Sequence, residues 1–565
     1  MAEITPMMKQ YLEIKEQNRD SILFFRLGDF YEMFNEDAKL ASRELDLTLT
    51  TRDRGKAAED QTPMCGIPYH SSDAYIARLI AKGYKVAICE QTEDPALAKG
   101  LVKRDIIRVI TPGTVIDSAC LDDRRGNFLC GLFFDAQNAG VAFCDMTTGH
   151  AHVTAFSGDD RLEHLENELS RFAPAEAVLS AVAFENEELV SYLRDRLSCA
   201  VERGESRFEL KACEKAIRAQ FGEERFASLP RSNPAASLAL GALLSYLHET
   251  QKTDLSYIKD LEYYEQGRFM ELDLSARRNL ELTETIRAKE KRGSLLWVLD
   301  KTRTAMGARN LRAWLTRPLR DVAAIERRLG AVEALTKHTV AREELILALS
   351  GISDMERLIG RIAYGTAGGR DFASLRSSIE KIAEVKAQLA SFPAGRLHEL
   401  DGELDPLADI ARRIRETLVD EPPFSVREGG FIRPGYNAEV DRLHEILSGG
   451  KGLLAGIEAR EKEKTGIRTL KIGYNKVFGY YIEVSNSFKE QVPETYIRKQ
   501  TLVNGERYIT EELKNLEQEI LTAGDRDKAL EFEIFTALRE SVTAESVRIQ
   551  RAAGLIAELD TLCSL

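Results

Sequence analysis

Apolar and polar residues in the first 112 positions change repeatedly between helical and strand-like spacing. Three segments have apolar residues three or four positions apart and predict helices: 7–18, 31–45 and 74–83. Four apolar runs predict strands: 21–28, 46–52, 84–91 and 105–114. The stretch 63–73, which contains Gly and Pro, predicts a turn. Helices and strands mixed in this way indicate an α/β domain.

A second α/β pattern follows a linker at residues 113–125. Three β runs come in succession, at 127–135, 140–149 and 150–156, and the short polar link between the first two predicts a hairpin. A helical segment, a short strand and further helices come next, and this region ends near residue 255. The pattern predicts a second α/β domain.

The remainder is mainly helical, with one β segment inside it. Residues 256–432 have almost purely helical spacing, and 441–466 predict a long charged helix that breaks at Gly449–Gly452. At residue 468 the apolar spacing changes to period two. Three β runs follow, two of them in a hairpin at 468–487 and a third at 494–509, before a long helix resumes. The sequence therefore predicts a small β insertion at the tip of two long helices.

The segment RLGDFYEMFNEDAKLASREL, residues 26–45, places two aromatic residues where a predicted strand passes into a predicted helix. Asp29 can cap that helix, and Glu32, three residues later, can complete a capping box. Three residues recur at helical spacing and are predicted to face a core: Phe34, Ala38 and Ala41. This local explanation does not account for both Phe30 and Tyr31 at the turn, so we expect one of them to point outward and Tyr31 to pack inward.

The composition is that of a globular protein with a strongly charged surface. The 565 residues are 30% charged and 44% hydrophobic, with a formal net charge of −13, and this length suggests about three to five domains. No apolar run approaches the roughly 18 residues of a transmembrane helix, and no signal peptide is visible. The eight cysteines form no CxxC pair, and no Cys and His residues have zinc-site spacing. We therefore expect reduced thiols, a cytoplasmic location and no metal site.

Charge is distributed unevenly along the chain. Between residues 468 and 508, seven basic side chains accompany four acidic ones, a net charge of +3. Lys and Arg together with Asn, Thr and Tyr are typical of contacts with the DNA backbone, although a solvated sheet face would have the same composition. Residues 1–112 hold 16 basic and 18 acidic side chains, so DNA binding by this part would depend on shape and insertion.

Sequence motifs give little support for an enzyme. The P-loop pattern GxxxxGK[ST] does not occur, nor do GxSxG and HExxH. Asp135 and Asp145 lie on neighbouring predicted strands and leave open a metal-dependent nuclease, which needs three or four converging carboxylates. Aspartates at strand ends are commonly turn residues. A helical scaffold that binds only proteins is a further alternative.

A set of motifs in fixed order is more specific than any of them alone. The chain contains TPMMKQYL, RLGDFYEMF, TPMCGIPYH, VAICEQ, VKRDIIRVITPGT, MGARNLRAWLTRPLRD, GYNKVFGYYIEVS and YIRKQTLVNGERYIT. Together these motifs resemble the bacterial MutS family of DNA mismatch-recognition proteins over essentially all of residues 1–565. The family continues into an ATPase domain with a P-loop, which we expect to be absent from this chain.

The resemblance implies a multidomain fold that combines α/β and all-α parts. It implies a mixed α/β mismatch-binding domain at 1–115 and a ribonuclease-H-like connector at 124–255. It also implies a long-helix lever core at 256–432 and 505–565, with a small β clamp inserted at 433–504.

The same resemblance implies DNA-contacting residues. Phe30 would insert into the minor groove beside a mispaired base, and Glu32 would form a hydrogen bond to that base. Contacts with the groove or the DNA backbone are implied for Pro68, Tyr69, His70, Lys471, Asn475, Lys476, Arg498, Lys499, Gln500 and Asn504.

The function implied is recognition of mismatches and small insertion or deletion loops in double-stranded DNA, which initiates repair. No catalytic residue and no cofactor is expected in this chain, whereas ATP and Mg²⁺ are expected for the intact family protein, a DNA-dependent ATPase. The implied partners are mismatched DNA, a second copy of the intact protein, a MutL-type repair protein and a sliding clamp, with no membrane. The implied location is the cytoplasm, and the nucleoid when the protein is on DNA.

Overall fold

The computed structural model describes residues 5–51, 61–93, 100–117, 120–253, 255–265, 267–423, 425–426, 428–475 and 479–565. The chain forms two compact units. The first contains residues 1–366, 377–407 and 543–565, and the second contains 367–376 and 408–542. Among the residues described, we find no helix with the length and apolar character needed to cross a membrane.

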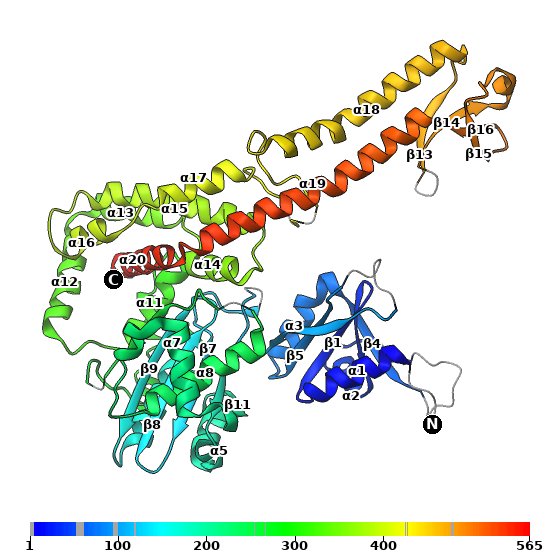
Figure 1. Cartoon of the computed structure of the whole chain (residues 1–565). Coiled ribbons are helices and arrows are strands. Elements are labelled where there is room, and N and C mark those ends of the chain that lie inside the picture. The colour runs from blue at the N-terminus through cyan, green and yellow to red at the C-terminus, as the bar shows by residue number, and fades with distance from the viewer. Residues whose placement is uncertain are drawn as a thin grey trace. The chain divides into compact units, whose positions relative to one another are not determined.

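The first unit begins with a six-stranded sheet in the order β3-β4-β2-β1-β5-β6 (Figure 1). Its strands are β1 (Ser21–Leu27), β2 (Phe30–Phe34), β3 (Thr50–Thr51), β4 (Pro63–Pro68), β5 (Lys85–Gln91) and β6 (Arg104–Ile110). Its helices are α1 (Pro6–Gln17), α2 (Asn35–Leu45), the 3₁₀ turn η2 (Tyr69–Ser71) and α3 (Ser72–Ile80). Helix α1 packs its buried residues on one face of the sheet, and α2 and α3 pack theirs on the other.

Two expectations for this region are corrected by the strand pairing. The helix expected over 31–45 begins only at Asn35, because residues 30–34 form β2, between β1 and β4. The turn expected at 63–73 is strand β4 as far as Pro68. Helical spacing and capping favoured the longer helix locally, but two neighbouring strands supply backbone hydrogen bonds that hold residues 30–34 extended.

A second six-stranded sheet, in the order β11-β10-β7-β8-β9-β12, follows in the same unit. Its strands are β7 (Phe128–Phe134), β8 (Asn138–Asp145), β9 (His150–Ser157), β10 (Glu176–Leu179), β11 (Ala200–Arg203) and β12 (Asp260–Tyr263). The first three are antiparallel, and β10 and β11 extend the sheet in parallel beside β7. This arrangement confirms the expected ribonuclease-H-like fold, and β12 carries the sheet past residue 255, where we expected it to end.

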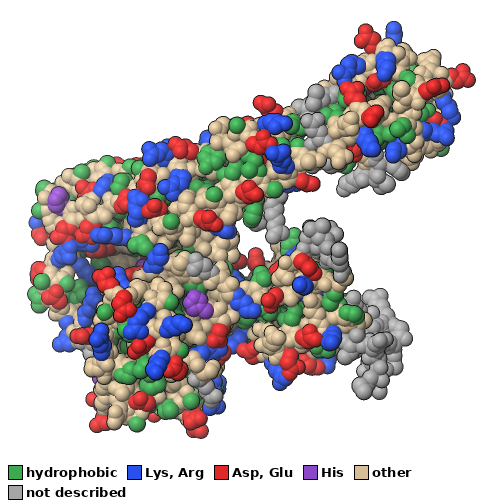
Figure 2. Space-filling view, in the orientation of Figure 1, with side chains coloured by type: hydrophobic (Ala, Val, Ile, Leu, Met, Phe, Trp, Pro, Cys, Tyr) green, Lys and Arg blue, Asp and Glu red, His purple; other side chains and the backbone are tan. Residues whose placement is uncertain are grey.

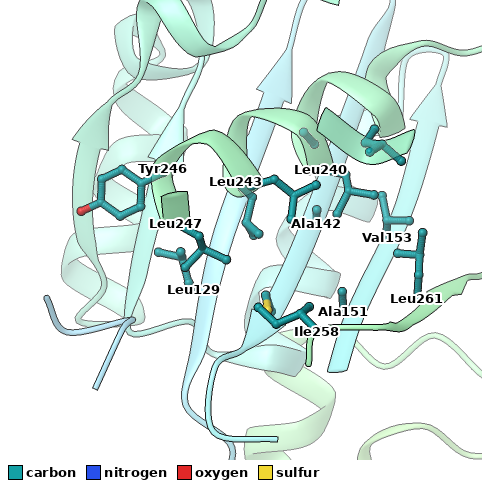
Figure 3. Close-up of a cluster of buried hydrophobic side chains, with 14 of the residues drawn as sticks. Leu129, Ala142, Ala151, Val153, Leu240, Leu243, Tyr246, Leu247, Ile258 and Leu261 are labelled. Carbon is teal, nitrogen blue, oxygen red and sulfur yellow. The ribbon is translucent and has the colours of Figure 1, made fainter. Parts of the chain in front are cut away.

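Helix α8 (Ala235–Gln251) packs its apolar face across the centre of this sheet (Figure 3). Leu240, Leu243 and Leu247 lie against side chains of β7, β8 and β9. Two glycines allow this close approach: a Cβ at Gly131 would lie 2.3 Å from the Ala239 carbonyl oxygen, and one at Gly140 would lie 2.1 Å from that of Ala235. Any larger residue would force the helix away from the sheet.

The other helices around this sheet are short or medium in length. They are α4 (Arg161–Phe172), α5 (Ala181–Glu185), α6 (Glu187–Ser191), the π-helical turn η4 (Tyr192–Arg196), the 3₁₀ turn η5 (Glu205–Arg207) and α7 (Leu210–Ala227). Helix α7 packs beside α8.

A helical region completes the first unit. Its helices are α9 (Leu274–Asn279), α10 (Leu295–Leu299), α11 (Ala305–Thr316), α12 (Val322–Lys337), α13 (Thr339–Leu349), α14 (Met355–Tyr364), α16 (Gly395–Glu403) and α20 (Ser546–Ser564). Helix α20 packs against α11, α13 and α14. The buried carboxylate of Asp560 on α20 accepts hydrogen bonds from the backbone N–H groups of Arg303 (3.0 Å) and Thr304 (2.8 Å), at the start of α11. These bonds tie the last helix of the chain to a helix some 250 residues earlier.

Two long helices that end in a small sheet dominate the second unit (Figure 1). The helices are α17 (Ala408–Thr417), α18 (Ala438–Thr465), α19 (Glu511–Thr543) and part of α15 (Gly369–Leu389). Helices α18 and α19 lie side by side, joined by ion pairs of Glu439 with Arg526 (2.9 Å) and of Arg460 with Glu512. Helix α18 is continuous through Gly449–Gly452, so the predicted helix break is wrong: a helix interior tolerates glycine at a cost of about 1 kcal/mol.

The small sheet has four antiparallel strands in the order β13-β14-β16-β15. They are β13 (Lys471–Asn475), β14 (Gly479–Ser485), β15 (Ile497–Thr501) and β16 (Gly505–Ile509), with the 3₁₀ turn η6 (Asn486–Gln491) between the second and third. The third β run expected at 494–509 is thus itself a hairpin. The domain boundary expected at residue 504 separates two paired strands, so the sheet continues to Ile509.

Candidate nucleic-acid interface

The tip of the β1–β2 hairpin positions Phe30. Leu27 pairs with Phe30, so Gly28 and Asp29 form a two-residue turn. Gly28 has φ +58°, a backbone conformation that glycine adopts without strain and that suits tight hairpins. Phe30 is the first residue after this turn and is 47% exposed. The hairpin therefore presents a large aromatic ring to solvent from a rigid sheet.

Side chains alternate between the two faces of β2. Tyr31 and Met33 are buried with α2 and α3, at 6% and 0% exposure. Phe30 and Glu32 lie on the opposite face, and Glu32 is half-buried between Phe25 and Gly66 on the two flanking strands. The prediction that Tyr31 packs inward is confirmed. The predicted capping box of Asp29 and Glu32 is wrong, because α2 starts after Phe34, which makes no side-chain capping bond.

Arg26 braces the hairpin tip from the other face of β1. Its Nε donates a hydrogen bond to the Gly28 carbonyl oxygen (2.5 Å), and its Nη1 donates one to Glu90 Oε1 on β5 (3.2 Å). The guanidinium carbon lies 3.5 Å from the centre of the Tyr69 ring, a stacking arrangement that favours arginine over lysine. The turn that carries Phe30 is thus fixed through contacts to β5 and to η2.

Tyr31 joins the same network from the adjacent strand. Its hydroxyl donates a hydrogen bond to Glu90, the carboxylate that also pairs with Arg26. Burial, and next this hydrogen bond, raise the pKa of Tyr31 well above its ordinary value. The tyrosine therefore remains a neutral donor at physiological pH and locks Glu90 in place.

The three residues expected near the groove lie at the end of β4 and the start of η2, directly beside the hairpin. Pro68 pairs with Phe30 across the strands and is half-buried. The backbone N–H of Tyr69 donates a hydrogen bond to the Asp29 carbonyl oxygen (3.0 Å), and the Tyr69 ring stacks on the Arg26 guanidinium. His70 is exposed, with its ring edge-on to that of Tyr69 at 5.8 Å. The structure thus brings Phe30, Glu32, Pro68, Tyr69 and His70 together.

Sequence reasoning missed Arg26 and Glu90 as parts of this site. Arg26 follows Phe25, which pairs with Cys89, so Arg26 and Glu90 occupy equivalent positions on neighbouring parallel strands. The strand register would have identified the pair, but the sequence does not state which strands are neighbours.

The expected clamp residues lie on both edges of the small sheet of the second unit. Lys471 and Asn475 begin and end β13 at one edge, with Lys471 exposed. Arg498, Lys499 and Gln500 lie on β15 at the other edge. Two further expected residues complete the set: Asn504, exposed in the β15–β16 turn, and Lys476, which lies outside the described residues.

Ion pairing divides the basic side chains of this sheet into two groups. Lys489 (2.7 Å) and Arg498 (3.4 Å) both pair with Glu506, and Lys489, whose hydrogen bond is the largest influence, holds the pKa of that carboxyl below its usual value. Arg507 pairs with Glu483 at 3.0 Å and donates a hydrogen bond to Gln500. Lys471 and Lys499 form no ion pair within the described part of the chain.

The surface of the small sheet is therefore mixed rather than uniformly basic. Figure 2 shows acidic and basic side chains interspersed over it. Such a surface can contact phosphates at individual lysines and polar groups, but it has no strong field that would hold any DNA duplex.

Asp135 and Asp145 have ordinary structural roles. Asp135 Oδ1 accepts hydrogen bonds from the backbone N–H groups of Gln137 (2.8 Å) and Asn138 (2.7 Å) in the β7–β8 turn. Asp145 is 3% exposed and accepts bonds from the N–H and hydroxyl of Thr147 and the N–H of Asn127. Both carboxylates accept hydrogen bonds from neighbouring residues at strand ends, so the nuclease alternative has no support.

Comparison with known proteins identifies the same regions. Three family models match: MutS domain I at residues 5–119, MutS domain II at 127–259 and MutS domain III at 275–565. Among curated relatives, the DNA mismatch repair protein MutS of Acetivibrio thermocellus is 47% identical over 568 residues, which cover 100% of this chain and 65% of the relative. The DNA mismatch repair protein MutS of Desulforamulus reducens is 47% identical, with 100% and 64% covered.

The chain therefore spans about 65% of the length of these relatives. The three matched models follow one another in chain order. The hairpin with Phe30 and Glu32 lies in the first, the ribonuclease-H-like sheet apart from β12 in the second, and the long helices with their small sheet in the third. This agreement along the whole sequence shows that the chain belongs to the MutS family.

Proposed function

We propose that this chain recognises base mismatches and small insertion or deletion loops in double-stranded DNA, and so initiates mismatch repair. The observation that carries the proposal is Phe30, which is 47% exposed at a braced hairpin tip with Glu32 two residues along on the same face of β2. Relatives named DNA mismatch repair protein MutS support this assignment.

An aromatic wedge is suited to sensing a mismatch. Insertion of an apolar ring between base steps costs a few kcal/mol of unstacking and kinks the duplex. A mispaired or unpaired base has already lost part of its pairing and stacking, so insertion there costs less. Phe30 would thus discriminate by how readily the duplex deforms, without reading a sequence.

Glu32 adds a second level of selection beside the wedge. Its carboxylate is repelled by the phosphates of any duplex, and it gains a compensating hydrogen bond only from a mispaired base in reach. In a correctly paired duplex the bases already form hydrogen bonds with each other, so Glu32 finds no such partner. The balance of 16 basic and 18 acidic side chains in residues 1–112 keeps binding of ordinary duplex weak.

The small sheet of the second unit would hold the DNA backbone. The contacts proposed are those of the exposed Lys471, Lys499 and Asn504, with Asn475, Lys476, Arg498 and Gln500 as further candidates. Contacts of this type fix position and register but carry no sequence information.

Family membership supports further proposals for the intact protein. It would be a DNA-dependent ATPase that uses ATP and Mg²⁺, acts as a homodimer, and engages a MutL-type repair protein and a sliding clamp. It would work in the cytoplasm, on the nucleoid when bound to DNA. These activities would depend on family regions beyond the three domains matched in this chain.

A binding titration tests the proposed function. Fluorescence anisotropy would compare a labelled duplex that contains one mismatch or one unpaired base with the fully paired duplex of the same sequence, at fixed salt. We expect the mismatched duplexes to bind at least about tenfold more tightly, because a few kcal/mol of insertion cost is partly removed. Equal affinities would contradict mismatch recognition, and no DNA binding at low salt would favour the protein-binding scaffold.

Arg26→Met should weaken the preference for mismatched over matched DNA, although we expect Arg26 to position Phe30 and not to contact DNA itself. The change removes the bonds to Gly28 and Glu90 and the stack on Tyr69, so the turn that carries Phe30 loosens. Loss of about 1 kcal/mol of positioning corresponds to a roughly fivefold lower preference for mismatched DNA, with affinity for matched DNA nearly unchanged. The same titration measures both affinities.

Arg19→Met is the matched control for this variant, because Arg19 is an exposed arginine on the same domain, and its ion pair within the described residues is with Glu16 on the adjacent helix. Arg19→Met should keep the preference. Equal losses in the two variants would mean that Arg26 acts through bulk charge, not through positioning.

A further inference from the structure

A histidine and two carboxylates converge between the two long helices of the second unit. His444 lies on α18, and Asp527 and Glu531 lie one turn apart on α19. One ligand atom from each residue lies within 4.8 Å of the other two. His444 Nε2 is 3.2 Å from Asp527 Oδ2 and 3.4 Å from Glu531 Oε1. The three side chains thus point at a common centre.

Both carboxylates are buried and incompletely satisfied. Asp527 is 5% exposed and Glu531 is fully buried. Glu531 Oε2 accepts hydrogen bonds from the backbone N–H groups of Gly430 (2.6 Å) and Phe431 (3.4 Å). By contrast, Glu531 Oε1, which faces His444, and Asp527 Oδ1 have no hydrogen-bond partner among the residues that the structure describes. Buried carboxylate oxygens of this kind are costly unless a cation or a donor compensates them.

Within the described part of the chain, His444 is the one basic side chain that forms an ion pair with either carboxylate. A single imidazole compensates two buried carboxylates incompletely.

The distances of the two carboxylates from His444 suit a tetrahedral metal ion. Zinc binds His nitrogen and carboxylate oxygen at about 2.0–2.2 Å, so two ligands at the tetrahedral angle lie about 3.3 Å apart. The separations from His444 Nε2 are 3.2 and 3.4 Å. An imidazole with two carboxylates is a donor set that zinc-class cations accept, whereas Mg²⁺ and Ca²⁺ prefer oxygen ligands alone.

We infer that His444, Asp527 and Glu531 form a binding site for a zinc-class divalent cation that links α18 to α19. Water would supply the fourth ligand, because His444 is partly exposed, with 34% of its side chain accessible. Through the bonds of Glu531 to Gly430 and Phe431, the ion would also fix the segment that precedes α18. This site is independent of DNA recognition, and it differs from the expectation of no metal site.

Calorimetric titration of the untagged, 565-residue chain with Zn²⁺ tests the site. We expect one Zn²⁺ per chain, a higher midpoint of thermal unfolding when it binds, and an affinity more than about tenfold lower in His444→Ala. Asp527→Asn keeps the side-chain shape and should weaken binding similarly. Far-ultraviolet circular dichroism of each variant checks that the helices remain formed.

His398→Ala is the matched control, because His398 is an exposed histidine on α16 and belongs to no such cluster in the described part of the chain. It should bind Zn²⁺ as the unmodified chain does. Cobalt substitution provides a second readout: the visible spectrum should be that of tetrahedral Co²⁺ without a thiolate band. No binding, equal binding by His444→Ala, or a thiolate band would overturn the proposal.

Discussion

Phe30→Ala should remove most of the preference of the chain for mismatched over matched DNA. A base stacked on an aromatic side chain contributes about 1–3 kcal/mol, so affinity for a mismatched duplex should fall by roughly 5- to 150-fold. Affinity for matched DNA should change much less, because on this proposal the ring would not enter an intact stack. Anisotropy titrations at one salt concentration measure both affinities, since DNA affinity depends steeply on salt.

The fold should tolerate this substitution. Phe30 is 47% exposed and belongs to neither core cluster of its domain, and surface substitutions usually change stability by no more than about 0.5 kcal/mol. Phe532→Ala is a matched control, because Phe532 on α19 is an equally exposed phenylalanine, at 48%. If Phe30→Ala retained the preference, or if both variants lost it equally, the wedge would be assigned to the wrong residue.

Glu32→Ala should tighten binding to matched DNA and weaken selectivity. Removal of one carboxylate beside the wedge removes its repulsion of the phosphates, and also the hydrogen bond available to a mispaired base. We expect a several-fold gain with matched DNA and a loss with mismatched DNA, together about a tenfold drop in preference, or about 1.4 kcal/mol. The gain with matched DNA should shrink as salt is raised, because salt screens the repulsion.

Two further variants separate the roles of Glu32. Glu32→Gln loses the charge but keeps hydrogen-bonding groups. Its affinity for matched DNA should therefore equal that of Glu32→Ala, whereas its affinity for mismatched DNA should be higher than that of the alanine variant. Glu36→Ala removes an equivalent charge from the first turn of α2, where the side chain is 85% exposed and paired with Lys39, and should have little effect. Unchanged or weaker binding of matched DNA by Glu32→Ala would exclude repulsion as the basis of selectivity.

The limits of sequence reasoning are clearest at residues 29–34. Capping chemistry predicted that Asp29 and Glu32 open a helix, and helical spacing of Phe34, Ala38 and Ala41 supported it. These three residues are indeed fully buried. The predicted start of the helix at Asp29 is wrong, because β1 and β4 flank residues 30–34 and pair with them. Hydrogen bonds to two neighbouring strands outweigh one capping interaction of about 1 kcal/mol.

Charge counting showed a similar limit in the small sheet. The sequence predicted a net charge of +3 at the tip of the two helices. Pairing of Arg498 and Lys489 with Glu506, and of Arg507 with Glu483, leaves fewer basic groups for DNA than the count suggests. Which charges neutralise one another depends on cross-strand register, which composition does not contain.

The sequence alone indicated the order of two α/β regions and a long-helix region, because periodicity is a local property. Its ordered motifs indicated the family, and that resemblance is the basis for proposing Phe30 and Glu32 as DNA contacts. Tertiary structure alone decided that Phe30 stands on a strand braced by Arg26, Glu90 and Tyr69. It also decided that His444 meets Asp527 and Glu531. Those contacts join residues that are far apart in the chain, and only the packing of strands and helices brings such groups within bonding distance.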